Sequence, residues 1–357
     1  MEISNDLRIP FPKVGFNPPV YYCKKTSEKP VLDGDLNKEF WSDAPFTDLF
    51  EDIEGSSMPA PRYNTRAKMK WTDNALYIGA ILYGDEIWAH LKERDCVIFY
   101  DNDFEIFIDP NSDTQEYLEY EMNALGTYWD LLLTKAYRDM GSPVNAMDIK
   151  GLQNAVKICG KLNTPDESNK YWSVEVMIPF TTPAECADSR KAPVPGEFYR
   201  VNFSRVQWKV DKENGTYTKL TDDNGKALPE DNWVWSPTGV INIHYPELWG
   251  FVFFCDDKVT DPEIPETERI KWELRKIYYA ENALLDTEGC YTDNKSIIED
   301  VIKDGMCIDS EKKINLEGYE LYTTPSYFEA SSYTKDKNQK VSIFADGKTT
   351  VTPANKE

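Results

Sequence analysis

The sequence contains few histidines and no clustered cysteines, and this shortage excludes several common kinds of site. Only two histidines, His90 and His244, occur among the 357 residues. The seven cysteines are scattered, and no Cys-x-x-Cys or Cys-x-x-Cys-His motif is present. We therefore expect no zinc site, no disulfide-dense scaffold and no haem. No Walker motif or dinucleotide-binding glycine motif occurs, so we expect no nucleotide cofactor.

Positive charge and long hydrophobic runs are also scarce. The chain has 62 acidic and 40 basic residues and a net charge of -22, which repels nucleic acid and anionic membrane surfaces. No apolar run reaches the roughly 18 residues that a membrane-spanning helix needs. We therefore expect neither a nucleic-acid partner nor membrane insertion. Because the first ten residues lack the apolar segment of a signal peptide, the chain either is cytoplasmic or has lost a signal sequence.

Aromatic residues and short alternating segments are abundant. Aromatics make up 13% of the chain, with 10 Trp and 21 Tyr, a composition that suits the packing of large β cores. Residues 171–178 alternate so that Trp172 and Val174 share one face, while Ser173 and Glu175 are either solvated or line a groove. Short runs of this kind, separated by turn residues and not by helical patterns, predict a β-sandwich over residues 20–257. The other clear runs are residues 65–71, 75–83, 104–109, 117–123 and 128–134.

The last hundred residues follow a different pattern. Residues 258–268 are acidic and contain prolines, which indicates a linker. Residues 266–285 carry apolar side chains at helical spacing, and a shorter helix is predicted at residues 296–303. Later segments alternate like strands. We therefore expect a small α+β appendage over residues 269–357, with one long helix on a short antiparallel sheet, and an N-terminal extension over residues 1–19.

Several motifs occur in a characteristic order along the predicted sandwich. The first three are V-L-D-G-D-L followed by F-W, then W-T-D-N-A-L-Y-I, and then D-F-E-I-F-I-D. In this order they resemble the family 9 carbohydrate-binding modules and their relatives in the DOMON-like sandwich superfamily. The matching segments are residues 31–41, 67–78, 101–110, 171–180, 200–205, 235–237 and 246–250.

The resemblance implies a fold, a location and a ligand. The implied fold is a mainly β, jelly-roll-like sandwich of two antiparallel sheets with structural calcium. The implied location is extracytoplasmic (secreted, periplasmic or at the cell surface), with the signal peptide removed and a role in polysaccharide utilisation. The implied ligand is a sugar held between two aromatic rings. Flat rings contact the C–H faces of a sugar, while carboxylates and amides satisfy its hydroxyls.

The same resemblance assigns residues to the sugar slot. Its first stacking ring aligns with Phe99, and Tyr100 stands beside it. Its second ring aligns near residues 243–245, where this chain has no Trp. Glu105 aligns with a carboxylate that hydrogen-bonds sugar hydroxyls. Further candidates, provided that their strands share a face with Glu105, are Glu121, Asn123, Arg205, Trp129 and Trp208.

A calcium site is also a candidate on the loop that follows the D-F-E-I-F-I-D segment. Asp109, Asn111 and Asp113 place oxygen ligands at alternate positions, an arrangement that suits a hard cation such as calcium. The glycine and the bidentate glutamate of an EF-hand loop are absent. Turns rich in Asp and Asn also form without any metal, so a calcium site and a metal-free turn both fit this pattern.

These features predict a protein that binds an oligosaccharide or polysaccharide without catalysing a reaction. Two alternatives of a different class stay open. One is a glycan-processing enzyme that pairs Glu105 with Glu121 or Asp103, which needs a separation of about 5 to 9.5 Å. The other is an interaction or assembly module whose residues 258–357 dock a protein partner.

Overall fold

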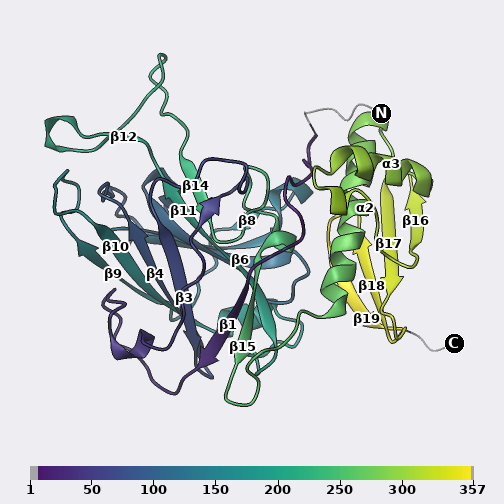
Figure 1. Ribbon diagram of the computed structural model, residues 1–357, viewed down its shortest axis with the longest axis horizontal. Coiled ribbons are helices and arrows are strands. Elements are labelled where there is room, and N and C mark those ends of the chain that lie inside the picture. Colours follow the sequence, from purple (N-terminus) through teal and green to yellow (C-terminus); the bar gives the residue numbers. More distant parts are fainter. Residues whose placement is uncertain (1–6, 355–357) are drawn as a thin grey trace.

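A computed structural model describes residues 7–354 and contains two units that lie side by side (Figure 1). Residues 1–6 of the predicted N-terminal extension lie outside the described residues. A short helix, α1 (Thr181–Cys186), belongs to the larger unit. The strands of that unit are β1 (Val20–Lys25), β2 (Glu51–Asp52), β3 (Thr65–Trp71), β4 (Ala75–Tyr83), β5 (Asp103–Asp109), β6 (Gln115–Asn123), β7 (Tyr128–Lys135), β8 (Pro143–Val144), β9 (Gln153–Cys159), β10 (Tyr171–Pro179), β11 (Phe198–Gln207), β12 (Val210–Asp211), β13 (Thr218–Lys219), β14 (Asp231–Val234) and β15 (Gly250–Cys255).

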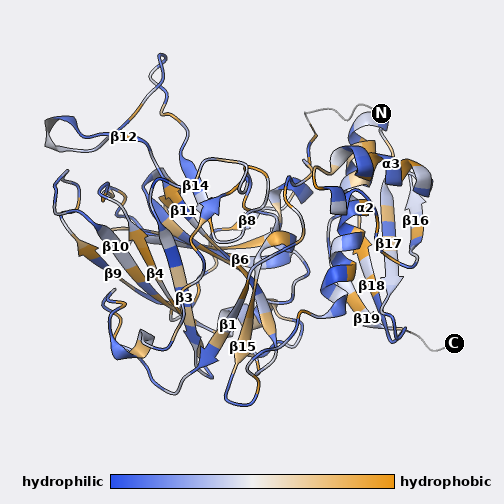
Figure 2. Ribbon diagram, in the orientation of Figure 1, coloured by the Kyte–Doolittle hydropathy of each residue, from blue (hydrophilic) through white to orange (hydrophobic). Residues whose placement is uncertain are grey.

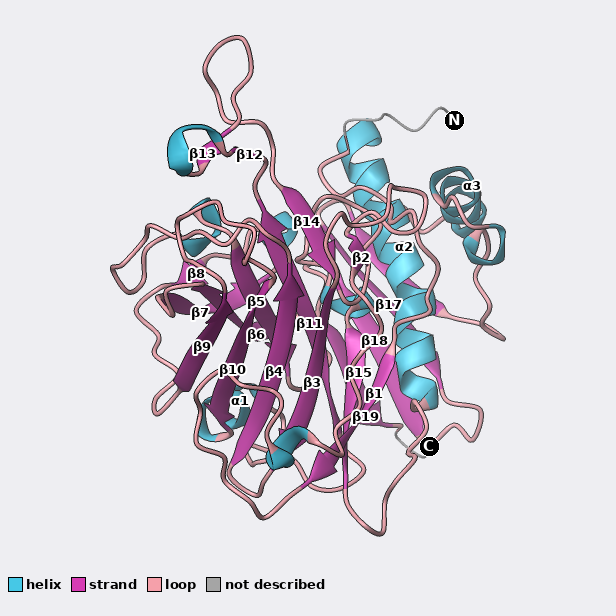
Figure 3. Ribbon diagram, turned by 60° about the vertical axis from the view of Figure 1, so that its left-hand side comes forward, coloured by secondary structure: helices cyan, strands magenta, loops and turns pink. Residues whose placement is uncertain are grey.

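The larger unit is a curled 13-stranded sheet whose two halves enclose the main core (Figure 3). The strands follow the order β8-β7-β6-β5-β11-β15-β1-β3-β4-β10-β9, and β14 joins at β11 and carries β2. Buried side chains of β4 and β10 meet those of β5 and β6 in one hydrophobic cluster. This arrangement confirms the predicted mainly β sandwich. Its pairs are antiparallel except those of β1, which runs parallel to both β15 and β3.

Strand β10 shows how alternation builds this core. Trp172 and Val174 are buried in the main cluster, as their spacing predicts. The opposite face is buried too, because Glu175 binds the loop that carries the D-G motif. The Glu175 carboxylate accepts hydrogen bonds from Trp41 Nε1 at 2.7 Å and from the Asp33 and Gly34 amides at 2.9 Å. Gly34 has φ +79°, and a Cβ there would lie 2.3 Å from the Lys157 amide nitrogen. Alternating hydrophobic and hydrophilic residues are visible along the strands in Figure 2.

We expect Glu175→Gln to lower the free energy of unfolding by about 1.5 to 3 kcal/mol, because the neutral amide loses charge-assisted hydrogen bonds inside the fold. Lys38 Nζ also lies 2.8 Å from this carboxylate. Urea denaturation monitored by tryptophan fluorescence would measure the change. Asp35→Asn is the control, because it breaks only the exposed Asp35–Lys157 ion pair beside the same loop and should change stability little. Equal effects of the two substitutions would contradict this role for Glu175.

The smaller unit is a four-stranded antiparallel sheet covered by helices. The long helix α2 (Glu266–Glu288) packs across β17 and β18, and Ile270, Leu274 and Ile277 share a core with Phe328 and other sheet residues. This confirms the predicted α+β appendage with one long helix on a short antiparallel sheet. The remaining elements of the unit are α3 (Lys295–Gly305), β16 (Glu320–Thr324), β17 (Tyr327–Tyr333), β18 (Gln339–Phe344) and β19 (Thr349–Pro353).

The two units share a hydrophobic core. Ile9 and Phe11, near the N-terminus, and Tyr245 and Leu248, just before β15, are buried in the same cluster as the inner face of α2. Figure 1 shows the N-terminal segment running beside the helices of the smaller unit. The helix begins at Glu266, inside the predicted linker. The described residues after 257 therefore form a docked unit, and the division at residues 258–268 stays a prediction.

A buried polar network reinforces this contact between the units. Arg138 Nη2 donates to Glu247 Oε2 at 2.8 Å, and the hydroxyl of Tyr279 on α2 donates to Glu247 Oε1. Ser112 Oγ donates to Glu268 Oε2, also on α2, at 2.6 Å. These side chains have less than a tenth of their surface exposed. Within residues 7–354, no helix is both long enough and apolar enough to cross a membrane.

Candidate functional site

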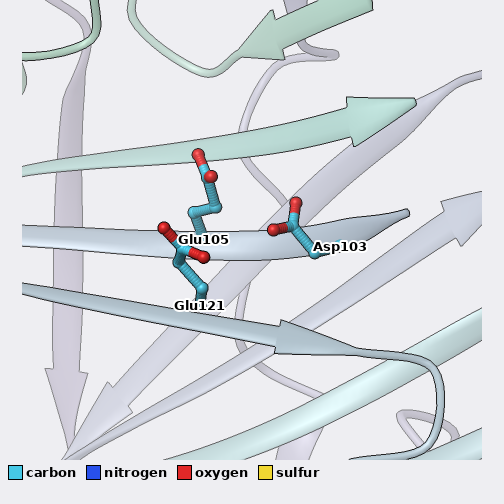
Figure 4. Close-up of side chains that lie close together, drawn as sticks. All are labelled: Asp103, Glu105 and Glu121. Atoms are coloured by element: carbon cyan, nitrogen blue, oxygen red, sulfur yellow. The ribbon is translucent and has the colours of Figure 1, made fainter. Parts of the chain in front are cut away.

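Three carboxylates converge on one face of two neighbouring strands. Glu105 on β5 lies directly opposite Glu121 on β6, and Asp103 precedes Glu105 by two residues on the same face. One oxygen of each side chain lies within 4.8 Å of an oxygen of the other two. Figure 4 shows the three side chains on the same side of these strands. Among residues 7–354 they are the one group of three or more His, Cys, Asp or Glu side chains close enough to hold a metal ion.

A fourth carboxylate, Glu119, adjoins this group. It lies two residues before Glu121 and therefore on the same face of β6, and its side chain is hydrogen-bonded to that of Glu121. Sequence reasoning missed Glu119, although the alternation Glu119, Glu121 in a predicted strand is a usable signal. We call Asp103, Glu105, Glu119 and Glu121 the acid cluster. It occupies the outer face of β5 and β6, away from the main core.

The acid cluster is buried, and no lysine or arginine of the described chain forms an ion pair with it. Its four side chains have at most 6% of their surface exposed. Asp103 Oδ1 accepts a hydrogen bond from the Val206 amide, and Glu121 Oε2 accepts one from the Phe99 amide, both at 3.2 Å. Asp103 Oδ2 and Glu119 Oε2 are buried and have no hydrogen-bond partner.

Burial without cations makes these carboxylates hard to ionise. Burial, opposed in part by a hydrogen bond from Ser204, raises the pKa of Glu105 to about 7. Burial and the charge of Glu105 raise the pKa of Glu119 to about 8. The same two causes raise the pKa of Asp103 and of Glu121 well above the usual range. A cluster of this kind holds either protons or a bound cation.

Aromatic side chains lie beside the acid cluster, and two of them face solvent. The short helix Ile98–Tyr100 carries Phe99, whose amide contacts Glu121, and Tyr100, which is 56% exposed. Tyr137 is 43% exposed. Partial burial and the charges of Glu119 and Glu121 raise the pKa of Tyr137 to about 12. The Tyr137 ring packs on His244, whose ring also contacts Phe107 on β5.

Tyr137 also lies near the position of the second stacking ring, where residues 243–245 contain no Trp. The His244 ring packs edge-on against Tyr137 with ring centroids 4.7 Å apart, and His244 Nδ1 is hydrogen-bonded to the Tyr117 hydroxyl at 2.8 Å. An exposed ring therefore stands next to the aligned position but comes from a different segment. Nothing in the local sequence around Tyr137 points to this position, because the contact joins residues more than 100 positions apart.

Two predicted ligand residues, Arg205 and Asn123, have polar atoms that are hydrogen-bonded within the chain. Ser204 on β11 pairs with Glu105, so Arg205 projects from the opposite face. Its guanidinium donates to Gln207 Oε1, Thr65 Oγ1 and the Tyr83 carbonyl oxygen, and only 2% of its surface is exposed. The structure thus places Arg205 on the face opposite Glu105 with partners inside the chain, and its assignment to the sugar slot stays a prediction.

Asn123 lies at the end of β6, where its polar atoms are already occupied. Its amide nitrogen donates to the Leu91 carbonyl oxygen and to Asp101 Oδ2, and its oxygen accepts from the Leu125 and Thr127 amides. It is fully buried. These bonds hold the turn after β6. Asn123 is also the cross-strand neighbour of Asp103, and its role as a ligand residue stays a prediction.

The other two candidates, Trp129 and Trp208, lie at the edges of the cluster. Trp129 on β7 is the cross-strand neighbour of Glu121, and its indole N–H is buried with no hydrogen-bond partner. The Trp208 indole donates to the Phe99 carbonyl oxygen at 2.8 Å and supports the helix that carries Tyr100.

The predicted calcium loop lies at the contact with the smaller unit. Asp109 accepts hydrogen bonds from the Asn111, Ser112 and Thr114 amides. The side-chain nitrogen of Asn111 donates to Asp188 Oδ1 at 2.9 Å. Asp113 accepts from the Gln115 amide and pairs with Lys348 at 3.3 Å. Each side chain thus has partners within the chain, and calcium at this loop stays a prediction.

The chain was compared with known families and solved structures. A carbohydrate-binding module of family 9 from Caldicellulosiruptor kristjanssonii, solved with cellotriose and also with glucose, is 18% identical over 69% of this chain and 100% of its own, with a TM-score of 0.41. A proposed carbohydrate-binding protein from Bacteroides uniformis is 15% identical over 67% of this chain and 100% of its own, with a TM-score of 0.49. No curated protein matches the chain. The family described as "carbohydrate family 9 binding domain-like" matches residues 32–250, and the chain therefore belongs to this family.

Proposed function

We propose that the protein binds an oligosaccharide or polysaccharide at the acid cluster and its flanking aromatic rings, without catalysing a reaction. Membership of a carbohydrate-binding family supports the ligand class. The exposed ring of Tyr100 is the observation that supports this location. It packs on the Phe99 ring at a centroid distance of 5.0 Å, and the Phe99 backbone amide donates a hydrogen bond to the Glu121 carboxylate.

The chemistry of the site suits a sugar. The exposed rings of Tyr100 and Tyr137 offer apolar surface to the C–H faces of a pyranose. Glu105 and Glu119, which retain a few per cent of their surface exposed, supply oxygen atoms for its hydroxyls. Hydroxyl desolvation offsets much of the gain from these hydrogen bonds, so we expect weak binding at each site.

We expect Tyr100→Ala to weaken binding about tenfold, because the ring provides exposed stacking surface. A glycan array that includes cellotriose and glucose would identify the best ligand, and titration calorimetry would then compare wild type, Tyr100→Ala, Phe99→Ala and Tyr137→Ala. Tyr322→Ala is the matched control, because Tyr322 is an equally exposed tyrosine (63%) on the smaller unit.

Three results would contradict the proposal. Binding that is unchanged in Tyr100→Ala and Tyr137→Ala but lost in Tyr322→Ala would move the site to the smaller unit. Release of reducing sugars from a polysaccharide, abolished by Glu105→Gln, would show an enzyme with paired carboxylates. The absence of binding to any glycan would end the carbohydrate proposal.

We also propose an extracytoplasmic location and a role in polysaccharide utilisation, on the ground that such binding modules act on external glycans. Fractionation of the source cells with an antibody to the protein tests the location. A protein partner for residues 258–357 stays a prediction, and capture experiments with the full chain would test it.

A further inference from the structure

The negative charge of the acid cluster is buried without a compensating positive charge from the described residues, and a bound sugar would not supply one. Four carboxylates lie on one face of two strands and are nearly inaccessible to solvent. Ion pairs are common elsewhere in the described chain, yet none involves these four residues. Burying several like charges together is strongly unfavourable unless a cation or protons compensate them. Sugar hydroxyls carry no charge and cannot provide this compensation.

The geometry of the cluster fits a single hard cation. Oxygen atoms of Asp103, Glu105 and Glu121 lie within 4.8 Å of one another. Calcium binds oxygen at about 2.3 to 2.6 Å, so two oxygens on opposite sides of one ion are separated by up to about 5.2 Å. The three carboxylates could therefore contact one ion with little movement of the backbone.

Buried carboxylate oxygens without hydrogen-bond partners are a second observation at the acid cluster. Glu119 lies outside this trio, is more than nine-tenths buried, and keeps its Oε2 atom without any hydrogen-bond partner beside Glu121. Asp103 Oδ2 is likewise buried without a partner. Buried polar atoms in folded proteins almost always have a partner, so two free carboxylate oxygens at one site indicate a missing positive ligand.

The ligand set selects the class of cation. It consists of carboxylate oxygens, with the Ser204 hydroxyl beside Glu105, and it includes neither His nor Cys. Oxygen-only sites prefer hard cations such as calcium, while zinc prefers nitrogen and sulfur ligands. We propose that Asp103, Glu105 and Glu121 bind one divalent cation of the calcium class.

This cation site is distinct from the predicted calcium loop at Asp109, Asn111 and Asp113. The loop carboxylates have amide and lysine partners, whereas the cluster lacks cationic ones. The proposal concerns the carboxylates themselves and does not rest on sugar binding. A metal titration without sugar therefore tests it separately from the proposed function.

The experiment is a terbium titration of the chelator-treated full-length protein, with tryptophan excitation and competition by calcium. Trp129 is the cross-strand neighbour of Glu121 and should sensitise terbium emission. We expect the terbium emission to saturate as terbium is added and to fall when calcium displaces the terbium. Glu121→Gln, which keeps the shape of the side chain, should weaken terbium and calcium binding by about tenfold or more. Asp113→Asn should leave the binding unchanged.

Circular dichroism would show whether Glu121→Gln is folded, and the wild type provides a second measurement if it is not. Calcium should raise the melting temperature of the chelator-treated wild type, because a ligand that binds only the native state stabilises it. The proposal is overturned if neither terbium emission nor a calcium-dependent rise in melting temperature occurs. It is also overturned if Asp113→Asn abolishes binding while Glu121→Gln retains it.

Discussion

Deletion of residues 258–357 is expected to abolish cooperative folding of the remaining sandwich. The deletion would uncover Tyr245 and Leu248, which are now buried against the inner face of α2. It would also leave Glu247 and Arg138 without Tyr279, in a region that was closed to solvent. Exposure of a large apolar surface together with buried charges leads to aggregation. The fragment should therefore be insoluble or lack a sharp thermal transition.

Expression of residues 7–257 with and without separately expressed residues 258–357 would test this. We expect recovery of soluble protein only when both fragments are present. A soluble monomer of residues 7–257 that melts as sharply as the full chain would contradict the expectation. That result would support the predicted linker at residues 258–268 between independent domains.

Glu247→Ala is expected to lower the free energy of unfolding by about 3 kcal/mol, because it removes the nearer carboxylate partner of the buried Arg138 and leaves only Asp139, at 3.5 Å. Arg138 has 2% of its side-chain surface exposed and lies 2.8 Å from Glu247. Urea denaturation at pH 7 would measure the loss. Glu288→Ala at the exposed end of α2 is the control and should change stability by less than about 0.5 kcal/mol.

The pH dependence of this effect has a definite sign. Although burial opposes ionisation, the guanidinium groups of Arg138 and Arg275 lower the pKa of Glu247 to about 2. In the unfolded chain the pKa of a glutamate is about 4.3. The stabilisation is therefore complete above pH ~4.3 and is lost as the pH falls toward 2. The difference between wild type and Glu247→Ala should shrink between pH 5 and about pH 2; a constant difference would contradict the assignment.

Much of the fold could be predicted from the sequence because apolar and polar residues alternate visibly along the strands. The run around Trp172 and Val174 and the helical spacing of Ile270, Leu274 and Ile277 are examples, and both segments form the predicted elements. What could not be predicted is how the units meet. The contact of Phe11 with the smaller unit joins residues more than 200 positions apart, and no local pattern encodes it.

The candidate site was predicted only in part, and register explains the difference. Glu105 and Glu121 face each other because β5 and β6 pair in the register that joins them. A shift of one residue moves every side chain of a strand to its other face, and Arg205 lies one residue past the position that pairs with Glu105. The pairing register of these strands cannot be predicted from the sequence alone. The place of Tyr137 could not be predicted for a related reason, because its ring packs on His244, more than 100 positions away in the sequence.

The parallel placement of β1 has a consequence for biosynthesis. Residues 20–24 of β1 pair with residues 251–255 of β15, so the first strand of the sandwich cannot find one of its neighbours until most of the chain has left the ribosome. Contacts between residues so far apart in sequence form slowly, and chains that wait for them expose apolar strands meanwhile. The buried contacts of Ile9 and Phe11 form later still, because they require α2. During synthesis the N-terminal segment therefore lacks the buried contacts that α2 provides in the folded protein until the chain is nearly complete.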